Sequence, residues 1–395
     1  MPVAARTSHL RVRHGHSRVT FVELFFDLVF VFAVTQLSHG LLEHLTPLGA
    51  LQTAILMLAV WWAWIDNAWL TNWLDPERAP VRMLLFVLML LGLVVSAAIP
   101  KAFAERALPF ALAYAALEIL PKLFMLWALK KHDAGNQRNF VRITIWRALG
   151  AACWLAGGFV DGPARLAFWG LALAIDTASP LLGFFVPGLG RSTTADWNVE
   201  GAHMAERCGL FVIIALGESI LITGQTFAGL AWTGATLAAF VNAFVASVAM
   251  WVVYFNIGAE RSSRVFSAST DPGRLARSGY TYLHIPIVAG IIVAAVADEL
   301  MLHHPGGHTD LKTAVVILGG PALYLAGNSL FKWLTAPWAP LSHTVGLGLL
   351  AVLILAVPFL PPLALSAAAT AVLILVAVWE WVSLGLRADH PPVGH

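Results

Sequence analysis

Two acidic residues in an apolar stretch near the N-terminus are the first candidates for chemistry. Glu23 and Asp27 lie four residues apart in TFVELFFDLVFVFAVTQLSH, so a helix would place both carboxylates on one face. At mid-membrane each acid costs about 2.5–3.5 kcal/mol, whereas each Leu, Phe or Val gains only about 0.3–0.6 kcal/mol. The acidic face therefore needs partner helices or water, and it could bind a proton or cation. In a structural alternative, Glu23 caps the helix or pairs with an arginine.

A second apolar stretch, HMAERCGLFVIIALGESI, carries His203 and Arg207 four residues apart. Glu218 lies on the same helical face as Arg207, but the two are separated by about 16 Å at ~1.5 Å per residue and cannot pair. Glu23 and Asp27 are candidate partners for Arg207, in either a structural or a functional ion pair. Glu218 is the best candidate for a proton or cation site, because a carboxylate near mid-membrane favours its neutral form.

Other intramembrane ionisable residues complete the set of candidates. Glu118 and Lys122 have the i, i+4 spacing of an ion pair and are expected to neutralise each other. Arg147 and Asp176 could pair across helices or act separately in a polar cavity. His284 precedes a proline by two residues and is expected to be a hydrogen-bonded core histidine rather than a ligand.

The segment HHPGGHTD resembles a metal-binding cluster only superficially. Its His303, His304, His308 and Asp310 lie in a loop without supporting residues, so we expect no metal site. Asp298 is expected to be solvated at the outer end of its span.

The composition shows which kind of element must position these side chains. Hydrophobic residues make up 59% of the 395 residues, charged residues make up 12%, and the mean hydropathy is +0.76. The apolar segments are about 18–25 residues long and do not alternate, as expected for membrane-spanning α-helices. Cys153 and Cys208 both lie in apolar segments, which favours reduced thiols over a disulfide or zinc site. The net charge of +2 gives no reason to expect nucleic-acid binding.

The sequence predicts an all-α integral membrane protein with about 12 transmembrane helices after a basic cytoplasmic tail at 1–19. The predicted spans are 20–41, 49–71, 81–99, 107–130, 140–160, 164–186, 204–226, 232–257, 279–302, 312–334, 341–360 and 363–387.

The basic residues predict the orientation of this layout. Eighteen of the 24 lysines and arginines fall in the tail, in the even-numbered loops or at helix ends on that side. Lys101, Arg106, Arg165 and Lys312 lie on the opposite side, and Lys122 and Arg147 lie inside spans. By the positive-inside rule, both termini are expected to be cytoplasmic.

The predicted spans divide into two parallel six-helix repeats, at 20–190 and 200–390. The seventh, ninth and tenth spans can be aligned in order with the first, third and fourth. The last of these alignments pairs Tyr114 with Tyr324, Glu118 with Asn328, and Lys122 with Lys332.

Two motifs together resemble the bacterial low temperature requirement A (LtrA) family. They are ELFFDLVFV from Glu23 and HMAERCGLFVIIALGESI from His203, and the similarity covers nearly the whole chain, including YTYLHIPIVAGI from Tyr280. The resemblance implies a multi-pass protein of the bacterial inner membrane and does not imply a mechanism. A fainter similarity links Phe25-Phe26-Asp27 to the Phe-Ser-Asp motif of potassium channels built from two six-helix repeats. Leu210, which aligns with Asp27, departs from that pattern.

The expected function is transport, or channel-like conduction, of protons, a small cation or a small solute through a polar path between the repeats. The alternative is a non-transporting membrane protein that binds lipid or a partner during low-temperature or stress adaptation. Common nucleotide-binding, zinc-protease, redox and hydrolase motifs are absent from the sequence, so we expect no enzyme, catalytic residue or cofactor. The expected partners are the bilayer and the transported species, and the chain could form a homo-oligomer.

Overall fold

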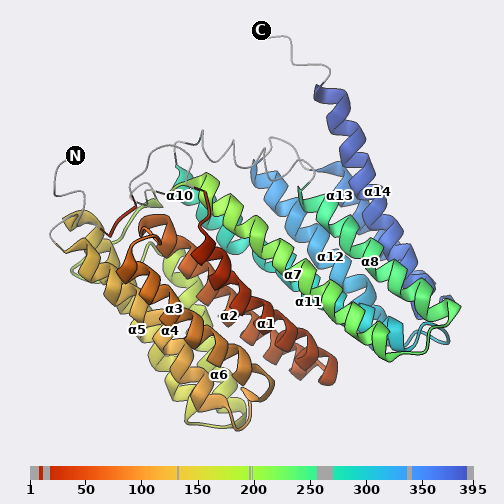
Figure 1. Cartoon of the computed structure of the whole chain (residues 1–395), viewed down its shortest axis with the longest axis horizontal. Coiled ribbons are helices and arrows are strands. Elements are labelled where there is room, and N and C mark those ends of the chain that lie inside the picture. Colours follow the sequence, from red (N-terminus) through yellow and green to blue (C-terminus); the bar gives the residue numbers. More distant parts are fainter. Residues whose placement is uncertain are drawn as a thin grey trace. The chain divides into compact units, whose positions relative to one another are not determined.

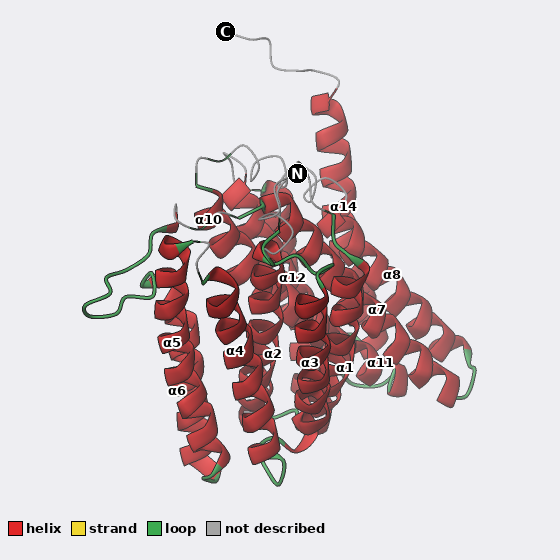
Figure 2. Cartoon of the chain, turned by 60° about the vertical axis from the view of Figure 1, so that its left-hand side comes forward, coloured by secondary structure: helices red, strands yellow, loops and turns green. Residues whose placement is uncertain are grey.

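The computed structural model describes residues 9–11, 18–130, 133–194, 197, 199–255, 269, 271–335 and 340–388, with the backbone alone at 384–388. Within these residues the regular structure is helical, without strands (Figure 2). Two isolated β-bridges join Leu10 to Leu74 and Val186 to Gly190.

The long helices follow the apolar segments of the sequence (Figure 1). They are α1 (Phe21–Glu43), α2 (Pro47–Trp73), α3 (Ala79–Ala98), α4 (Ala107–Leu129), α5 (Ala134–Gly158), α6 (Gly162–Leu181), α7 (Gly201–Gly229), α8 (Gly234–Phe255), α11 (His284–His303), α12 (Leu311–Thr335), α13 (Leu341–Leu353) and α14 (Pro362–Ala388). Short helical segments are η2 (Ile99–Lys101), α10 (Pro272–Leu275), the π-helix η4 (Ala276–Tyr282) and η5 (Ile354–Phe359).

Each predicted span coincides with one of these helices, and the ends differ by six residues or fewer when η4 and η5 are included. Ten of the helices in the described residues are long and apolar enough to cross a membrane. The helices α5 and α6 fall below that criterion, and α5 carries Arg138, Arg142 and Arg147. The fold is therefore an all-α, multi-pass membrane protein.

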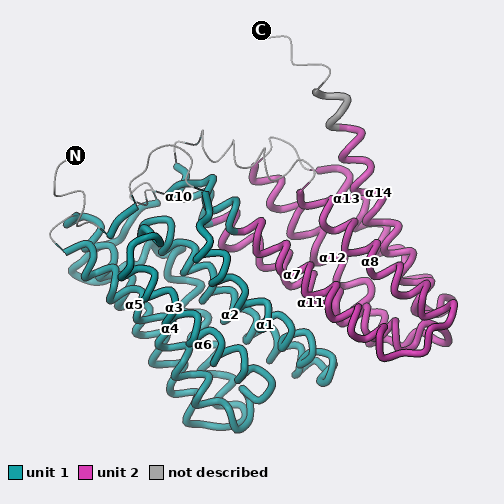
Figure 3. Tube along the Cα trace, in the orientation of Figure 1, with its two compact units in different colours: residues 1–207, 269–277 teal, residues 208–268, 278–395 magenta. Residues whose placement is uncertain are grey.

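The chain forms two compact units (Figure 3). The first contains Met1–Arg207 and Ser269–Arg277, and the second contains Cys208–Ala268 and Ser278–His395. The division falls seven residues into α7, whereas the predicted repeats divide the chain between residues 190 and 200.

In the first unit, α2 is the central helix. It contacts α1 as well as α4 and α6, while α3 packs on α1 and α4, and α5 packs between α4 and α6. Side chains from α2 can therefore meet partners from both groups of helices.

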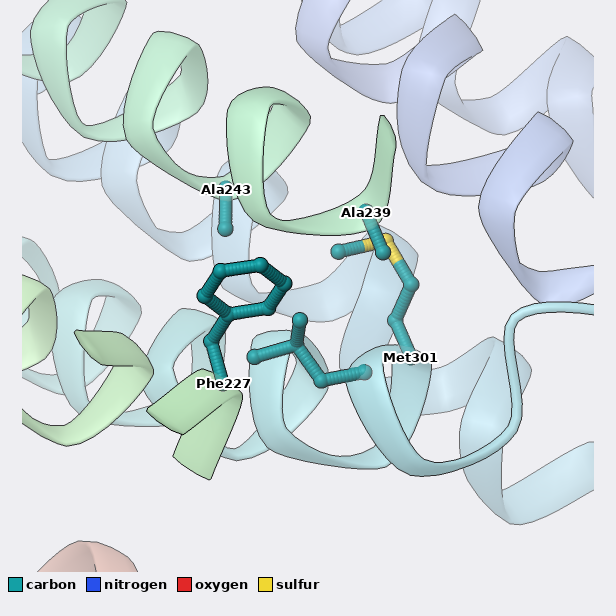
Figure 4. Close-up of a cluster of buried hydrophobic side chains, with 5 residues drawn as sticks. Phe227, Ala239, Ala243 and Met301 are labelled. Carbon is teal, nitrogen blue, oxygen red and sulfur yellow. The ribbon is translucent and has the colours of Figure 1, made fainter. Parts of the chain in front are cut away.

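In the second unit, α11 and α12 approach closely because glycines face the neighbouring backbone. A Cβ atom on Gly290 would lie 2.6 Å from the Tyr324 nitrogen, and one on Gly320 would lie 2.8 Å from the Ala294 nitrogen. At one end of α11, buried side chains from α7, α8 and α11 form a small apolar core (Figure 4). Its members are Phe227, Ala239, Ala243, Met301 and Leu302.

Candidate functional site

Two groups of buried charged side chains lie inside the first unit. We define the Arg207 cluster as Glu23, Asp27, Trp64, Thr71, Asn72, His203 and Arg207. We define the Arg147 cluster as Asp66, Glu118, Lys122, Arg147 and Asp176. Helix α2 contributes to both, because Trp64 and Asp66 are two residues apart and point to different sides of the helix.

The N-terminus of α1 positions Glu23 in the Arg207 cluster. Thr20 is the N-cap, and its hydroxyl accepts a hydrogen bond from the Glu23 amide. In return, the Thr20 amide donates to Glu23 Oε2 at 2.8 Å, which completes a capping box. The capping prediction for Glu23 is thus confirmed, and its Oε1 atom remains available for other helices.

Arg207 joins both acids of α1. Its Nη1 donates to Glu23 Oε1 at 3.3 Å and its Nη2 donates to Asp27 Oδ1 at 2.6 Å. Nη1 also donates to the Thr71 hydroxyl at 3.1 Å, and the guanidinium lies 5.7 Å from the Trp64 ring centroid. The sequence-based pairing of Arg207 with the two acids is therefore confirmed.

The hydrogen bonds around His203 define its tautomer. The Glu200 amide donates to Asn72 Oδ1 at 2.9 Å, and Asn72 Nδ2 donates to the Glu200 carbonyl at 3.0 Å, which fixes the orientation of the amide. The same Nδ2 faces His203 Nδ1 at 3.3 Å, so Nδ1 accepts. The ring proton therefore lies on Nε2, which donates to Glu23 Oε1 at 2.9 Å, and the imidazole is neutral.

A segment from the N-terminal tail covers this cluster. Backbone hydrogen bonds join Arg11 to Trp73 and Asp75 to His9, and the His9 ring stacks on Trp127 at 4.7 Å. The guanidinium of Arg11 lies 3.4 Å from Glu23 Oε2. Two arginines thus balance the two carboxylates of the Arg207 cluster.

The Arg147 cluster gathers side chains from four helices. Lys122 Nζ donates to Asp66 Oδ2 at 2.7 Å, and Arg147 Nη2 donates to Asp66 Oδ1 at 3.1 Å. Arg147 Nη1 donates to Asp176 Oδ1 at 2.9 Å. The Glu118 carboxylate lies 3.5 Å from the same Nη1 atom, beyond a good hydrogen bond.

The charges of the Arg147 cluster do not balance. Three carboxyl groups share one guanidinium and one ammonium, and Glu118 is 1% exposed. Neither Glu118 oxygen has a hydrogen-bond partner among the described residues, and neither does the hydroxyl of Tyr114, one turn earlier on α4. The cluster is therefore neutral only when it holds one proton or one monovalent cation.

Tryptophan rings and a glycine pack directly against the charged side chains of the Arg147 cluster. Trp154 Nε1 donates to Asp176 Oδ2 at 3.3 Å, and the Arg147 guanidinium lies 5.2 Å from the Trp62 ring centroid. A Cβ atom on Gly150 would lie 2.6 Å from Asp176 Oδ1, so glycine is needed where α5 meets α6.

Two predictions about the Arg147 cluster have different outcomes. The pairing of Arg147 with Asp176 is confirmed. The mutual neutralisation of Glu118 and Lys122 is wrong, because Lys122 forms its ion pair with Asp66 on α2. The i, i+4 spacing within one helix favoured the Glu118–Lys122 pair. It gave no information about the competing carboxylate of Asp66 on another helix.

The structure places the remaining candidates in the second unit. His284 is a core histidine, as predicted: its Nδ1 donates to the Gly279 carbonyl at 2.9 Å, and Tyr254 Oη lies 2.7 Å from its Nε2. The solvated position predicted for Asp298 is wrong, because packing around α11 leaves it 4% exposed. Glu218 is buried on α7, and its role as a proton or cation site stays a prediction.

Asp66 is a site residue that the sequence-based predictions did not include. It is the only acid in the predicted span 49–71, and a single acid in an apolar span is the signal that could have identified it. Asn72 was also missed, and its role depends on the backbone of Glu200, which spacing does not reveal. In the described part of the chain, no group of three or more His, Cys, Asp or Glu side chains could hold a metal ion.

Comparisons with known proteins agree with the motifs. The family model of the bacterial low temperature requirement A protein (LtrA) matches residues 18–378. An uncharacterized protein of Rhizobium meliloti (strain 1021) is 39% identical over 369 residues, covering 93% of this chain and 90% of the relative. No solved structure matches. The two buried clusters and the multi-pass helical fold are thus those of a chain that belongs to the LtrA family.

Proposed function

We propose that the protein moves protons or a small cation across the bacterial inner membrane, with the Arg147 cluster as the binding site. The observation that carries this proposal is the excess carboxyl group in that cluster. An uncompensated charge away from water is costly, so the excess group favours binding of one positive charge. A site that gains and loses one proton or cation is the minimum requirement for such transport.

The second unit offers an internal comparison that supports this proposal. Its partly buried Lys332 pairs with Glu380 at 2.6 Å, one cation with one acid. The sequence alignment of the two halves places Asn328 where the first half has Glu118. A neutral residue at that position leaves the Lys332–Glu380 pair balanced, so the excess acid of the Arg147 cluster has no counterpart at the aligned position.

The proposal retains twelve spans in two six-helix repeats, with both termini cytoplasmic. Access to the site is supported by the Asp66 side chain, which is 17% exposed. Separately, a pocket of about 240 Å³ lies where α1, α2 and η2 meet, and no residue of the Arg147 cluster lines it. Its polar lining includes Gln36, His44, Gln52, Thr53 and Lys101, on the side that the charge distribution predicts to be external.

Reconstitution in liposomes tests the proposal. A pH-sensitive dye enclosed in the vesicles would report proton uptake driven by a potassium diffusion potential. Sodium and potassium fluxes would be measured in parallel. We expect flux through the wild-type protein and at least a tenfold loss in Glu118→Gln. Glu43→Gln, at an exposed position near the end of α1, is the matched control. Absence of proton, alkali-cation and small-solute flux, with Glu118→Gln indistinguishable from wild type, would overturn the proposal.

A second candidate function is lipid binding without transport. It is favoured by an open, apolar groove of about 510 Å³ between α8 and α14, lined partly by Leu237, Val241 and Ile374. The balanced Arg207 cluster also fits a purely structural role for buried ion pairs. Native mass spectrometry from nanodiscs would test this alternative. Retained phospholipid that is lost in Val241→Trp, together with no flux, would support it.

A further inference from the structure

We infer that Glu118 is the proton-carrying group of the Arg147 cluster and is a neutral carboxylic acid in the conformation described here. This inference rests on the proposed function for its role in transport. Protonation itself can be measured without transport.

The hydrogen bonds distinguish Glu118 from the other two acids. Asp66 receives a hydrogen bond on each oxygen, from Arg147 and Lys122. Asp176 also receives one on each oxygen, from Arg147 and Trp154. Such donors stabilise the ionised form of both aspartates. The two ionised aspartates balance the two cations, so the third acid is the one that must be neutral.

The surroundings of Glu118 favour a proton over a metal cation. Sodium or calcium would need several oxygen ligands, whereas a proton needs one carboxyl oxygen. The Arg147 guanidinium lies 3.5 Å from the Glu118 carboxyl group and would repel a metal cation bound there. At 1% exposure, Glu118 is also closed to a hydrated ion in this conformation.

Tyr114 supplies a means of stabilising the ionised form after the proton leaves. Tyr114 and Glu118 are four residues apart on α4 and so lie on one helical face. The buried Tyr114 hydroxyl has no hydrogen-bond partner in the described part of the chain, so its proton is available for donation. A rotation of either side chain would convert two unsatisfied groups into one hydrogen bond.

Infrared difference spectroscopy of the full-length protein in nanodiscs tests the inference. We expect a carboxylic-acid C=O stretching band that shifts in D₂O, decreases as the pH rises and is lost in Glu118→Gln. Glu43→Gln should retain the band. A carboxylic-acid region that is the same in Glu118→Gln as in wild type, or a Glu118 band that sodium or potassium removes at constant pH, would overturn the inference.

Chemical modification provides a second measurement on the unsubstituted protein. A hydrophobic carbodiimide reacts with protonated carboxyl groups in the membrane, and peptide mass spectrometry locates the adduct. We expect the adduct on Glu118 within the Arg147 cluster, formed at least tenfold more slowly in alkaline buffer. Modification of Asp66 or Asp176 in its place would overturn the assignment.

The two proposals fail in different ways. A protein that shows the Glu118 band but moves no protons would overturn the proposed function and leave the protonation state supported. Proton flux that persists in Glu118→Gln would overturn Glu118 as the carrier and leave transport supported.

Discussion

At the scale of single residues, the same types of side chain form two clusters with different electrostatics. In the Arg207 cluster, Glu23 and Asp27 are balanced by Arg207 and by Arg11 from the N-terminal segment that contacts the cluster. In the Arg147 cluster, Glu118 exceeds the available cations. The difference lies in the charge balance, because both clusters are buried and both contain bridging arginines.

Substitution of acids in the Arg147 cluster should separate the excess group from the paired groups. Glu118→Gln removes no hydrogen bond, so the free energy of unfolding should stay within about 1 kcal/mol of wild type. Asp66→Asn removes the ion-pair partner of Lys122 and should cost about 3–5 kcal/mol. Tryptophan fluorescence during thermal unfolding in detergent measures both. Equal destabilisation by the two substitutions would contradict the charge assignment.

A double-mutant cycle should measure the contact between Asp27 and Arg207. Each single substitution, Asp27→Asn or Arg207→Gln, leaves a buried charge without its main partner and should cost about 3–5 kcal/mol. The double variant should be more stable than the sum predicts, by about 0.5–3 kcal/mol. Additive losses would show that the 2.6 Å contact does not couple the two residues.

At the scale of helices, glycines determine where charged and apolar faces can meet. Gly150 allows α5 to approach the carboxylate of Asp176, and Gly290 allows α11 to approach the backbone of α12. The first contact positions a charged group, and the second brings two helices together. Their effects can be tested separately.

Gly150→Ala should displace the Asp176 carboxylate from Arg147. The added Cβ would lie 2.6 Å from Asp176 Oδ1, and the resulting overpacking should cost about 1–3 kcal/mol. Gly170→Ala on α6 is a control with no atom within 4 Å and should be neutral or stabilising by about 1 kcal/mol. Thermal unfolding midpoints compare the two variants. A stable Gly150→Ala protein would show that α5 and α6 can separate without loss.

Gly290→Ala should weaken the second unit more than a substitution of a glycine with open space around it. The new Cβ would meet backbone atoms of α12, including the Tyr324 nitrogen at 2.6 Å, which cannot move by side-chain rotation. Gly319→Ala, with no atom within 4 Å, is the control. Limited proteolysis in detergent should cleave Gly290→Ala faster. Equal cleavage rates would argue against backbone contact between α11 and α12.

The sequence predicts the helices better than it predicts their side-chain partners. Length and hydrophobicity locate each helix, because a bilayer requires about 20 apolar residues for a crossing. Spacing within one helix does not predict which neighbour competes for a charge, so the Lys122–Asp66 pair was missed. The burial of Asp298 was missed for a similar reason, since position near a span end does not reveal what packs over it.

At the scale of the whole molecule, the number of crossings decides how the bundle is organised. The family and the multi-pass fold follow from the sequence motifs and hydropathy. Membrane crossing by α5 and α6 depends on burial of their charged residues against other helices. Arg147 and Asp176 have such partners, so their charges do not have to face lipid.

Cysteine labelling should show that α5 and α6 cross the membrane. In a background of Cys153→Ser and Cys208→Ser, Phe159→Cys lies between the two helices at a position where the native side chain is 73% exposed. A membrane-impermeant maleimide should label this cysteine in intact cells. Glu77→Cys, in a predicted cytoplasmic loop, should react only after permeabilisation. Protection of Phe159→Cys in intact cells would show that the two helices do not cross as predicted.

The ion pair between Arg207 and Asp27 also has a consequence for the order of synthesis. The two residues are 180 positions apart, so at about 5–20 residues per second the ribosome makes Arg207 roughly 10–40 s after Asp27. During that interval α1 has its two acids but lacks the arginine and histidine of α7. Arg11 is already present to pair with Glu23, so the nascent first helix must stay at the insertion machinery or carry Asp27 protonated until α7 arrives. Formation of the ion pair between α1 and α7 is thus a late event in biogenesis, although α1 is the first helix to be made.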